Sequence, residues 1–188
     1  MMICNIVTEG KLDAEIVRKL LEPEIRSSDR RIHFTCAGGW SLAESTARSI
    51  LAVRQEPVAL IVNADSSRID RIEERRRFLE ESLREVATGA VFHVVLFVPE
   101  IEVLFFHPDV ISQLLGTSKE LSDAERTRAE YEPKRVLESL GLSRDVISRK
   151  LPRLDLTPVK AHTDVAELRS FVLGVNEGRS HKRRARAS

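Results

Sequence analysis

Carboxylates follow two apolar runs of the sequence, close to the point where each run ends. Glu9 comes directly after the apolar segment 2–8, and Asp65 comes shortly after a second apolar segment, 58–62. Open α/β sheets hold their ligands at the carboxyl ends of parallel strands, and hard divalent cations need converging oxygen ligands. The spacing therefore predicts two strands that deliver acids to one edge of a sheet, where they could bind Mg²⁺ or Mn²⁺.

Gly10 and Asp13 accompany Glu9 in the order expected of a strand-to-helix turn. Gly10 lets the backbone turn sharply and approach a phosphate closely. Asp13 lies in the first turn of the helix that is expected next. It either interacts favourably with the helix dipole or points back over the strand edge as a second metal ligand.

The segment 63–66 has two interpretations as well. Asn63 offers an amide oxygen, which can coordinate a hard cation but brings no negative charge. Because Mg²⁺ is usually held by only one or two carboxylates with water and substrate phosphate, Asn63 would weaken a site at Asp65 without necessarily abolishing it. Alternatively, the segment is a strand-to-helix turn with Asp65 or Ser66 as the N-cap.

These motifs resemble those of the Toprim domain, which is shared by topoisomerases, bacterial primases and recombination-repair proteins. The matching elements are Glu-Gly-x-x-Asp at residues 9–13 and Asn-Ala-Asp at 63–65, where the family has Asp-x-Asp. The first motif is similar to that of the "overcoming lysogenization defect" nucleases and of small stand-alone Toprim proteins. The segment 99–104 also resembles an element of those small proteins, so the resemblance covers roughly residues 2–106.

The resemblance implies roles for individual residues. It makes Asp65 the main magnesium anchor, and it makes Glu9 a general acid/base or a metal ligand. It favours Asp13 as a second-site ligand. It also implies that Glu102 is a further ligand or orients Asp65, with Glu100 as the competing candidate at the same turn.

Two of these assignments have ordinary alternatives. Acidic residues such as Glu100 and Glu102 are common beside a proline turn. Lys160 precedes the last expected helix, where some Toprim nucleases place a lysine that could stabilise charge on the scissile phosphate. It could equally be a solvated surface lysine.

Hydrophobic periodicity predicts four buried strands, near 2–8, 32–36, 58–63 and 91–98. Helices are expected between them, the second with Ser41 as its N-cap. Strands that alternate with helices imply a four-stranded, mainly parallel sheet with right-handed crossovers. Together with the resemblance, this predicts an α/β, Rossmann-like Toprim core over 1–106. Residues 107–177 are expected to form a C-terminal helical extension packed on that core.

The composition is that of a globular protein. With 188 residues, 42% of them apolar and 31% charged, the chain can bury a proper core. No run approaches the roughly 18 apolar residues of a membrane span, and the short N-terminal run has no basic segment before it, as expected of a strand and not of a signal peptide. Cys4 and Cys36 lack metal-ligand spacing and are expected to be reduced thiols in a cytoplasmic protein.

The chain ends in a basic tail, 178–188, which contains Lys182, Arg183, Arg184 and Arg186. Its composition predicts a disordered, solvated terminus. The same side chains could add non-specific phosphate contacts, and the two interpretations are compatible. The net charge of the whole chain is only +1, so the molecule as a whole is not a polycation.

Several classes of site are excluded by their missing motifs. The chain has no Gly-x4-Gly-Lys-Ser/Thr phosphate loop, no Gly-x-Ser-x-Gly elbow and no Cys-His dyad that the sequence makes evident. Tyr131 could act as a topoisomerase nucleophile only with a strand-gating domain, for which the chain is too short.

The first functional hypothesis is a metal-dependent phosphodiesterase that cleaves DNA or RNA, in bacterial defence or nucleic-acid processing. Lysogenization-defect nucleases fuse this domain to an ATPase, so a separately encoded ATPase is an expected partner by analogy, and no membrane is expected. The second hypothesis is a non-catalytic binding or regulatory subunit with a degenerate metal site. The third is nucleotidyl transfer as in primases, against which the lack of an evident template-binding domain counts.

Overall fold

A sheet of four parallel strands forms the centre of the protein. The strands are β1 Ile3–Thr8, β2 Arg31–Cys36, β3 Val58–Asn63 and β4 Phe92–Phe97, in the spatial order β2-β1-β3-β4. The predicted α/β, Rossmann-like architecture is thus confirmed. The computed structural model describes residues 3–27, 31–117 and 120–184, with the backbone alone for Ser27 and 176–184.

The strand order creates a switch point between β1 and β3. The chain leaves β1 towards β2 on one side and leaves β3 towards β4 on the other. The two connections diverge at the carboxyl ends of these strands, which is where doubly wound sheets bind their ligands. The last residue of β1, Thr8, pairs with Ile61, so Glu9 leaves the sheet beside the end of β3.

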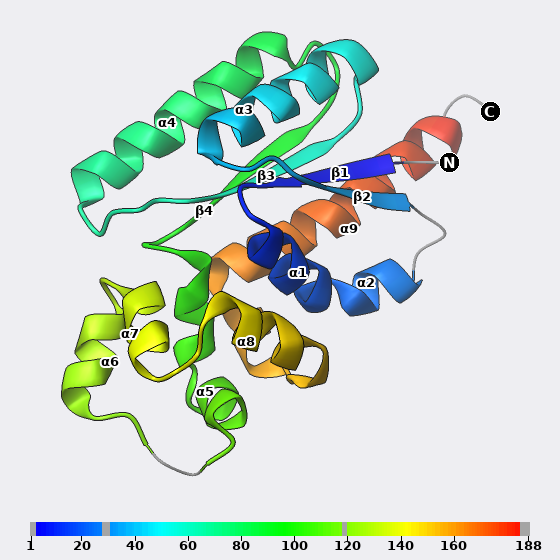
Figure 1. Cartoon of the computed structure of the whole chain (residues 1–188). Helices are drawn as coiled ribbons and strands as arrows, with labels where there is room; N and C mark the ends of the chain where they lie inside the picture. The colour runs from blue at the N-terminus through cyan, green and yellow to red at the C-terminus, as the bar shows by residue number, and fades with distance from the viewer. Residues whose placement is uncertain (1–2, 28–30, 118–119, 185–188) are drawn as a thin grey trace.

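Helices cover both faces of the sheet (Figure 1). α3 Trp40–Ser49 and α4 Ile69–Val86 pack on one face, and the π-helical turn Ile50–Arg54 extends α3. α1 Lys11–Leu20 and α9 Thr163–Arg184 cover the other face, with α2 Glu22–Ser27 beside them. Each face buries its own hydrophobic cluster. β3 is buried along its whole length, as expected of a central parallel strand with both faces covered.

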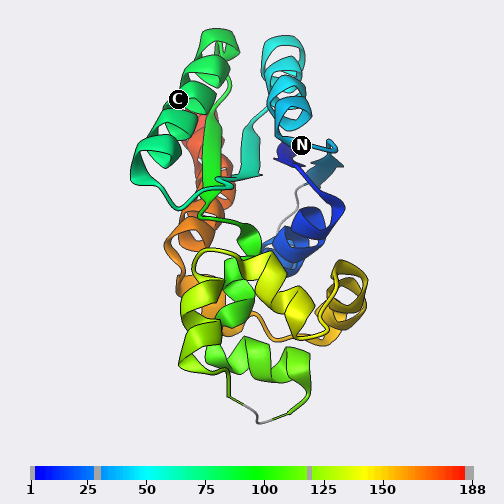
Figure 2. The same cartoon turned by 60° about the vertical axis from the view of Figure 1, so that its left-hand side comes forward.

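Short helices between β4 and α9 lie beyond the sheet, next to α1 (Figures 1 and 2). They are η2 Ile101–Phe106, α5 Pro108–Leu115, α6 Asp123–Ala129, α7 Pro133–Ser139, α8 Arg144–Lys150, η3 Leu151–Arg153 and η4 Thr157–Ala161. Phe105 and Leu137 from these helices belong to the same hydrophobic cluster as Ile6 and Phe97 of the sheet. The expected core and extension therefore share one hydrophobic core, and α9 is itself part of the layer that covers β4.

The start of α3 differs from the sequence prediction. Gly39, with a φ of 145°, is the N-cap, and the helix begins at Trp40, so Ser41 lies within the first turn and does not cap it. Glycine adopts a φ of this size without the strain that a side chain would cause. As a result Trp40 stands at the beginning of α3 and remains 40% exposed.

The C-terminal segment also differs from the prediction. The backbone of α9 is helical to Arg184, where the sequence predicted a disordered tail from residue 178. Arg186 and the side chains of Lys182, Arg183 and Arg184 lie outside what the structure describes, so their phosphate contacts stay a prediction. Among the described helices, none is long and apolar enough to cross a membrane.

Leu137→Ala should lower the free energy of unfolding by about 2–4 kcal/mol, because it removes packing from the core that the sheet and the extension share. Leu137 is 1% exposed. The only tryptophan, Trp40, reports the α3–α4 side of the sheet, whereas far-UV circular dichroism reports all helices. In urea, both signals should move together to lower concentrations.

Leu42→Ala, at a 58% exposed position on α3, serves as the control and should move neither signal. Separate fluorescence and dichroism transitions in the Leu137 variant would show that the extension unfolds independently of the sheet.

Candidate functional site

Glu9 joins the ends of three strands. Its carboxylate Oε1 accepts a hydrogen bond of 2.7 Å from the backbone N–H of Asn63 at the end of β3. Its backbone carbonyl accepts from the N–H groups of Gly38 and Gly39, which follow β2. Burial raises the pKa of the Glu9 carboxyl, the bond from Asn63 opposes that rise, and the charge of Asp65 adds to it. A carboxyl in such a position is suited to exchange a proton or to bind a cation.

Asp13 caps the beginning of α1, and its role as a metal ligand stays a prediction. Its carboxylate accepts a bond of 2.9 Å from the Gly10 N–H and so caps the first turn of α1. The side chain is buried, which raises its pKa, and it lines the same cavity as Glu9. A Cβ on Gly10 would lie 3.1 Å from the Asp13 carboxylate, so glycine leaves room for this capping bond.

Asn63 has a structural partner for its amide oxygen. The Oδ1 atom accepts a buried bond of 2.8 Å from the N–H of Ile101, the first residue of η2. The residue also lines the cavity that contains Glu9. Asn63 thus holds the exit of β3 against the turn that follows β4, and a metal ion at this oxygen would share it with the Ile101 N–H.

Asp65 stands at the predicted edge of the sheet, but its carboxylate is engaged elsewhere. The residue has a left-handed φ of 51°, and its N–H donates to the carbonyl of Pro99. The side chain is half exposed and forms an ion pair of 3.1 Å with Arg75 of α4. Since α4 begins at Ile69 after Arg68, neither Asp65 nor Ser66 is its N-cap.

Glu102 and Glu100 share a lysine from the extension. Lys134 Nζ lies 2.8 Å from Glu100 Oε1 and 3.9 Å from Glu102 Oε2. Glu102 is 2% exposed, and burial raises its pKa to about 7, against the opposing effect of Lys134. Burial acts to lower the pKa of Lys134, but Glu102 and Glu100 outweigh it and raise that pKa. Oε2 of Glu102 has no hydrogen-bond partner among the described residues.

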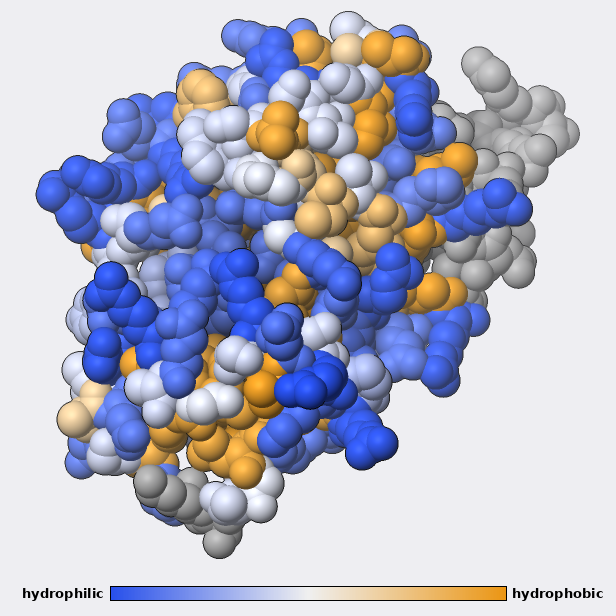
Figure 3. All heavy atoms as spheres, viewed as in Figure 1, coloured by the Kyte–Doolittle hydropathy of each residue, from blue (hydrophilic) through white to orange (hydrophobic). Residues whose placement is uncertain are grey.

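A cavity of about 480 Å³ brings part of this set together at the switch point. Glu9, Asp13 and Asn63 line it from the sheet side, and Lys134 and Arg144 line it from the short helices. Figure 3 shows a band of hydrophilic side chains across the molecule between the α3–α4 layer and those helices. Acids and bases thus enclose one space, which can attract a cation and an anionic phosphate together.

Three of the residues predicted for the site do not line this cavity: Asp65, Glu102 and Lys160. Lys160 lies in η4 and is partly buried. The pKa of Asp155 is lowered chiefly by hydrogen bonds from Thr157, and the charge of Lys160 adds a smaller effect. Lys134 occupies the place beside the acids instead, and sequence analysis missed it. Its only local signal is Pro133 at the start of α7, which marks a helix but says nothing of a site.

The described residues contain no ready-made group of three or more His, Cys, Asp or Glu side chains placed to hold a metal ion. No family model, curated protein or solved structure matches this chain.

Glu102→Gln should raise the free energy of unfolding at pH 8 and change it little at pH 4.5. The unfolded carboxyl titrates near 4.5 and the native one near 7, so the native state binds the extra proton between these values and loses stability as the pH rises. That loss is on the order of 3 kcal/mol, and the neutral glutamine avoids it. Lys134 keeps Glu100 as its partner in the variant.

Urea denaturation at the two pH values measures the difference. Glu130→Gln, at an exposed position, is the control for loss of a surface carboxylate. If the free energy of unfolding of Glu102→Gln differed from that of the native protein by the same amount at both pH values, the raised pKa of Glu102 would be contradicted.

Proposed function

We propose that this protein is a metal-dependent nucleic-acid phosphodiesterase of the Toprim type. The observation that carries the proposal is the cavity at the switch point between β1 and β3, where Glu9 and Asp13 face Lys134 and Arg144. Doubly wound sheets bind ligands at this place, and phosphodiester chemistry needs both oxygen ligands for a cation and positive groups for the phosphate.

The donor chemistry fits a hard divalent cation. Burial raises the pKa of Glu9 and Asp13, which line the cavity, so their negative charges are only partly compensated. A divalent charge would offset that cost. Glu102 lies outside the cavity lining, and one of its buried oxygens has no hydrogen bond among the described residues. Asp65 would have to exchange its ion pair with Arg75 for the metal. When bound, Mg²⁺ or Mn²⁺ supplies Lewis-acid polarisation of the phosphate and of a water molecule.

The protein's own residues would transfer the proton, neutralise charge on the phosphate and position the backbone. Glu9 takes or gives the proton, because its raised pKa brings it closer to neutral pH. Lys134 and Arg144 neutralise charge on the phosphate, the role that the sequence assigned to Lys160. Asp13 fixes the Gly10 turn, where the backbone can come close to a phosphate. A cytoplasmic location and a separately encoded ATPase partner are parts of the same proposal.

One observation favours a second candidate function, a non-catalytic binding or regulatory subunit. The two side chains at the Asp-x-Asp position are already engaged, Asn63 by the Ile101 N–H and Asp65 by Arg75. If these contacts persist when Mg²⁺ or Mn²⁺ is present, the cavity would serve as a binding surface for phosphates and not as a reaction centre.

Purified protein with Mn²⁺ or Mg²⁺, alone or with its ATPase partner, should nick or cleave a nucleic acid. Glu9→Gln and Asp65→Asn should each lower the rate by at least about 100-fold, because one loses the proton-transfer group and the other a charged metal ligand. Glutamine at position 9 keeps an oxygen for the Asn63 N–H, so the strand ends stay joined. A gel assay of plasmid and single-stranded substrates measures the rates.

Asp70→Asn provides the control, because Asp70 is an exposed carboxylate on α4 that pairs with Arg68. It should cleave at the native rate. Cleavage that survives both site substitutions, or that persists with a chelator, would assign the activity to something else. Tight Mn²⁺ binding without any cleavage would favour the binding subunit.

Asn63→Asp should bind Mn²⁺ more tightly and make the metal-free protein less stable. The new carboxylate can still accept from the Ile101 N–H, but it adds a buried negative charge near Glu9 and Asp65. Like charges in one site raise each other's pKa and cost roughly 1–3 kcal/mol at neutral pH, a cost that a bound cation removes.

Calorimetric titration and urea denaturation of both proteins test this pair of effects. Asn63→Ala is the matched control, because it leaves the Ile101 N–H unpaired without adding charge, so it should lose stability and gain no affinity. Equal Mn²⁺ affinity and equal metal-free stability in the native and Asn63→Asp proteins would place residue 63 outside the metal site.

A further inference from the structure

A second cavity, of about 650 Å³, opens on the other side of the β3 exit. Asp65 lines it, together with two aromatic side chains, Trp40 and Phe78, and two arginines, Arg71 and Arg75. Glu9 and Lys134 belong to the first cavity and not to this one. The candidate metal anchor therefore faces an aromatic and arginine-lined space, whose volume is in the range of pockets for small organic ligands.

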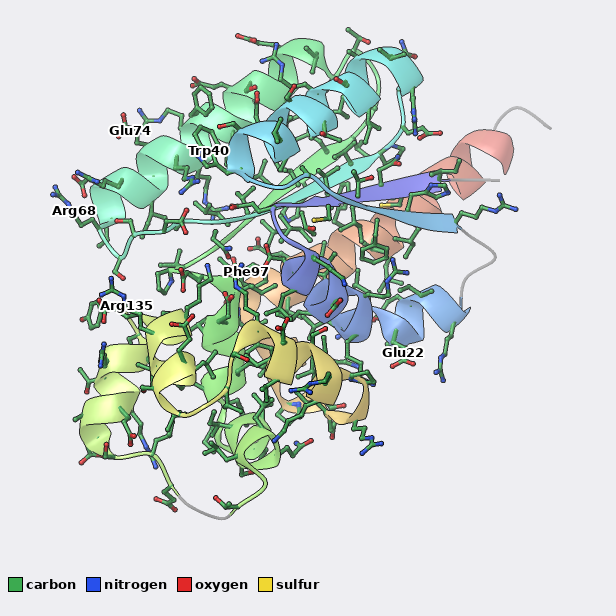
Figure 4. All side chains as sticks on the ribbon, in the orientation of Figure 1. Glu22, Trp40, Arg68, Glu74, Phe97 and Arg135 are labelled. Carbon is green, nitrogen blue, oxygen red and sulfur yellow. The ribbon has the colours of Figure 1, made fainter. Side chains whose placement is uncertain are left out.

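The aromatic groups of this cavity are exposed and held in place. Trp40 is 40% exposed and Phe78 is 51% exposed, although both are large apolar side chains. Their rings meet edge to face, with centroids 6.3 Å apart and an interplanar angle of 80°. Figure 4 shows Trp40 at the start of α3, turned towards α4. Two exposed aromatic rings that fix each other form a surface on which a flat ligand can stack.

Arg75 ties this surface to the candidate metal site. Its guanidinium lies 5.0 Å from the centroid of the Trp40 ring, donates to the Ala64 carbonyl at 2.8 Å and pairs with Asp65. The indole, the arginine and the carboxylate are thus one connected unit, positioned before any ligand arrives. Such preorganisation lowers the entropy cost of binding.

The charges around the cavity suit a phosphate next to the stacked group. Arg71 is exposed at its wall, and Arg68, one turn earlier, is exposed outside it. Arg68 pairs with Asp70, and Glu74 also lines the cavity, so the arginines are partly balanced by acids. A divalent cation at Asp65 would tip this balance towards positive charge.

We propose that the Trp40–Phe78–Arg71–Arg75 cavity binds an unpaired base of a single-stranded nucleic acid, stacked on Trp40, with the adjoining phosphate held by Arg71 beside Asp65. The choice of nucleic acid as the ligand rests on the proposed function. Base stacking on aromatic side chains with arginine at the backbone is the usual chemistry of single-strand binding. The bases of an intact duplex are already stacked inside the helix and cannot reach such a surface.

The intrinsic fluorescence of Trp40 provides a direct test, because it is the only tryptophan in the chain. The native protein is titrated in chelator, where metal-dependent cleavage is absent. The ligands are a short single-stranded oligonucleotide, an abasic strand of equal length, the matching duplex and a mononucleotide. The single strand should quench the fluorescence and saturate. The abasic strand and the duplex carry phosphates without an available base, so they should quench little.

Variants are compared by the anisotropy of a labelled single strand. Trp40→Ala should weaken binding about 5- to 150-fold, the range expected for the loss of one stacked base, whereas Trp40→Phe should retain most of the affinity. Tyr131→Ala is the matched control, since Tyr131 is an aromatic residue that is 60% exposed on the extension and lies outside this cavity. Circular dichroism confirms that each variant is folded.

Three results would overturn the proposal: equal quenching by the abasic strand or the duplex, equal affinity of Trp40→Ala and the native protein, or a mononucleotide that binds as tightly as the strand. Quenching by a partner protein with none by any nucleic acid would also overturn it. The outcome is separable from that of the nuclease proposal. If the single strand alone quenches the fluorescence but no cleavage occurs in Mn²⁺, base binding at the Trp40 cavity is supported and the nuclease activity is not. If cleavage occurs without quenching, the nuclease activity is supported and base binding at the cavity is not.

Discussion

The hydrogen bond between the Glu9 carboxylate and the Asn63 N–H is the contact on which the site depends. The backbone carbonyl of Glu9 also accepts hydrogen bonds from the N–H groups of Gly38 and Gly39. A single residue therefore sets the spacing of the ends of β2, β1 and β3. This position is costly for a carboxylate, because burial opposes its charge. The same residue therefore fixes the edge of the sheet and has a carboxyl whose pKa is raised by burial.

The part of the site that the sequence could predict is the part that lies on the sheet. An apolar run followed by Glu9 marks the end of β1, and a second run followed by Asp65 marks the end of β3, because buried parallel strands are continuous apolar segments. From these two ends the parallel sheet and its acidic edge follow. The extension was recognised as helical, but its hydrophobic continuity with the sheet through Phe105 and Leu137 depends on long-range packing.

The directions of the side chains could not be predicted, because distant residues determine them. Asp65 turns towards Arg75 of α4 in a left-handed backbone conformation that no local motif signals. The amide of Asn63 is taken by the N–H of Ile101, a contact between the ends of two different strands. Lys134 reaches the acids from α7, whose position depends on its packing against α6 and η2. The residues at the end of β3 therefore lie between two cavities, one that contains Glu9 and Lys134 and one that contains Trp40 and Asp65.

The place of α9 in the chain has a consequence for biosynthesis. All four strands precede α9 in the sequence, and so do Glu9 and Asp65. Nevertheless α9 is the helix that covers β4. While the chain emerges from the ribosome, Val95 and Phe97 therefore lack part of the hydrophobic cluster that buries them until Val165 and Leu168 of α9 follow. Apolar surface that is exposed during synthesis makes a chain prone to aggregation, so we expect this interval to be the most vulnerable stage of folding. The face of β4 that α9 covers can therefore be closed only after the intervening residues 98–162 have been synthesised.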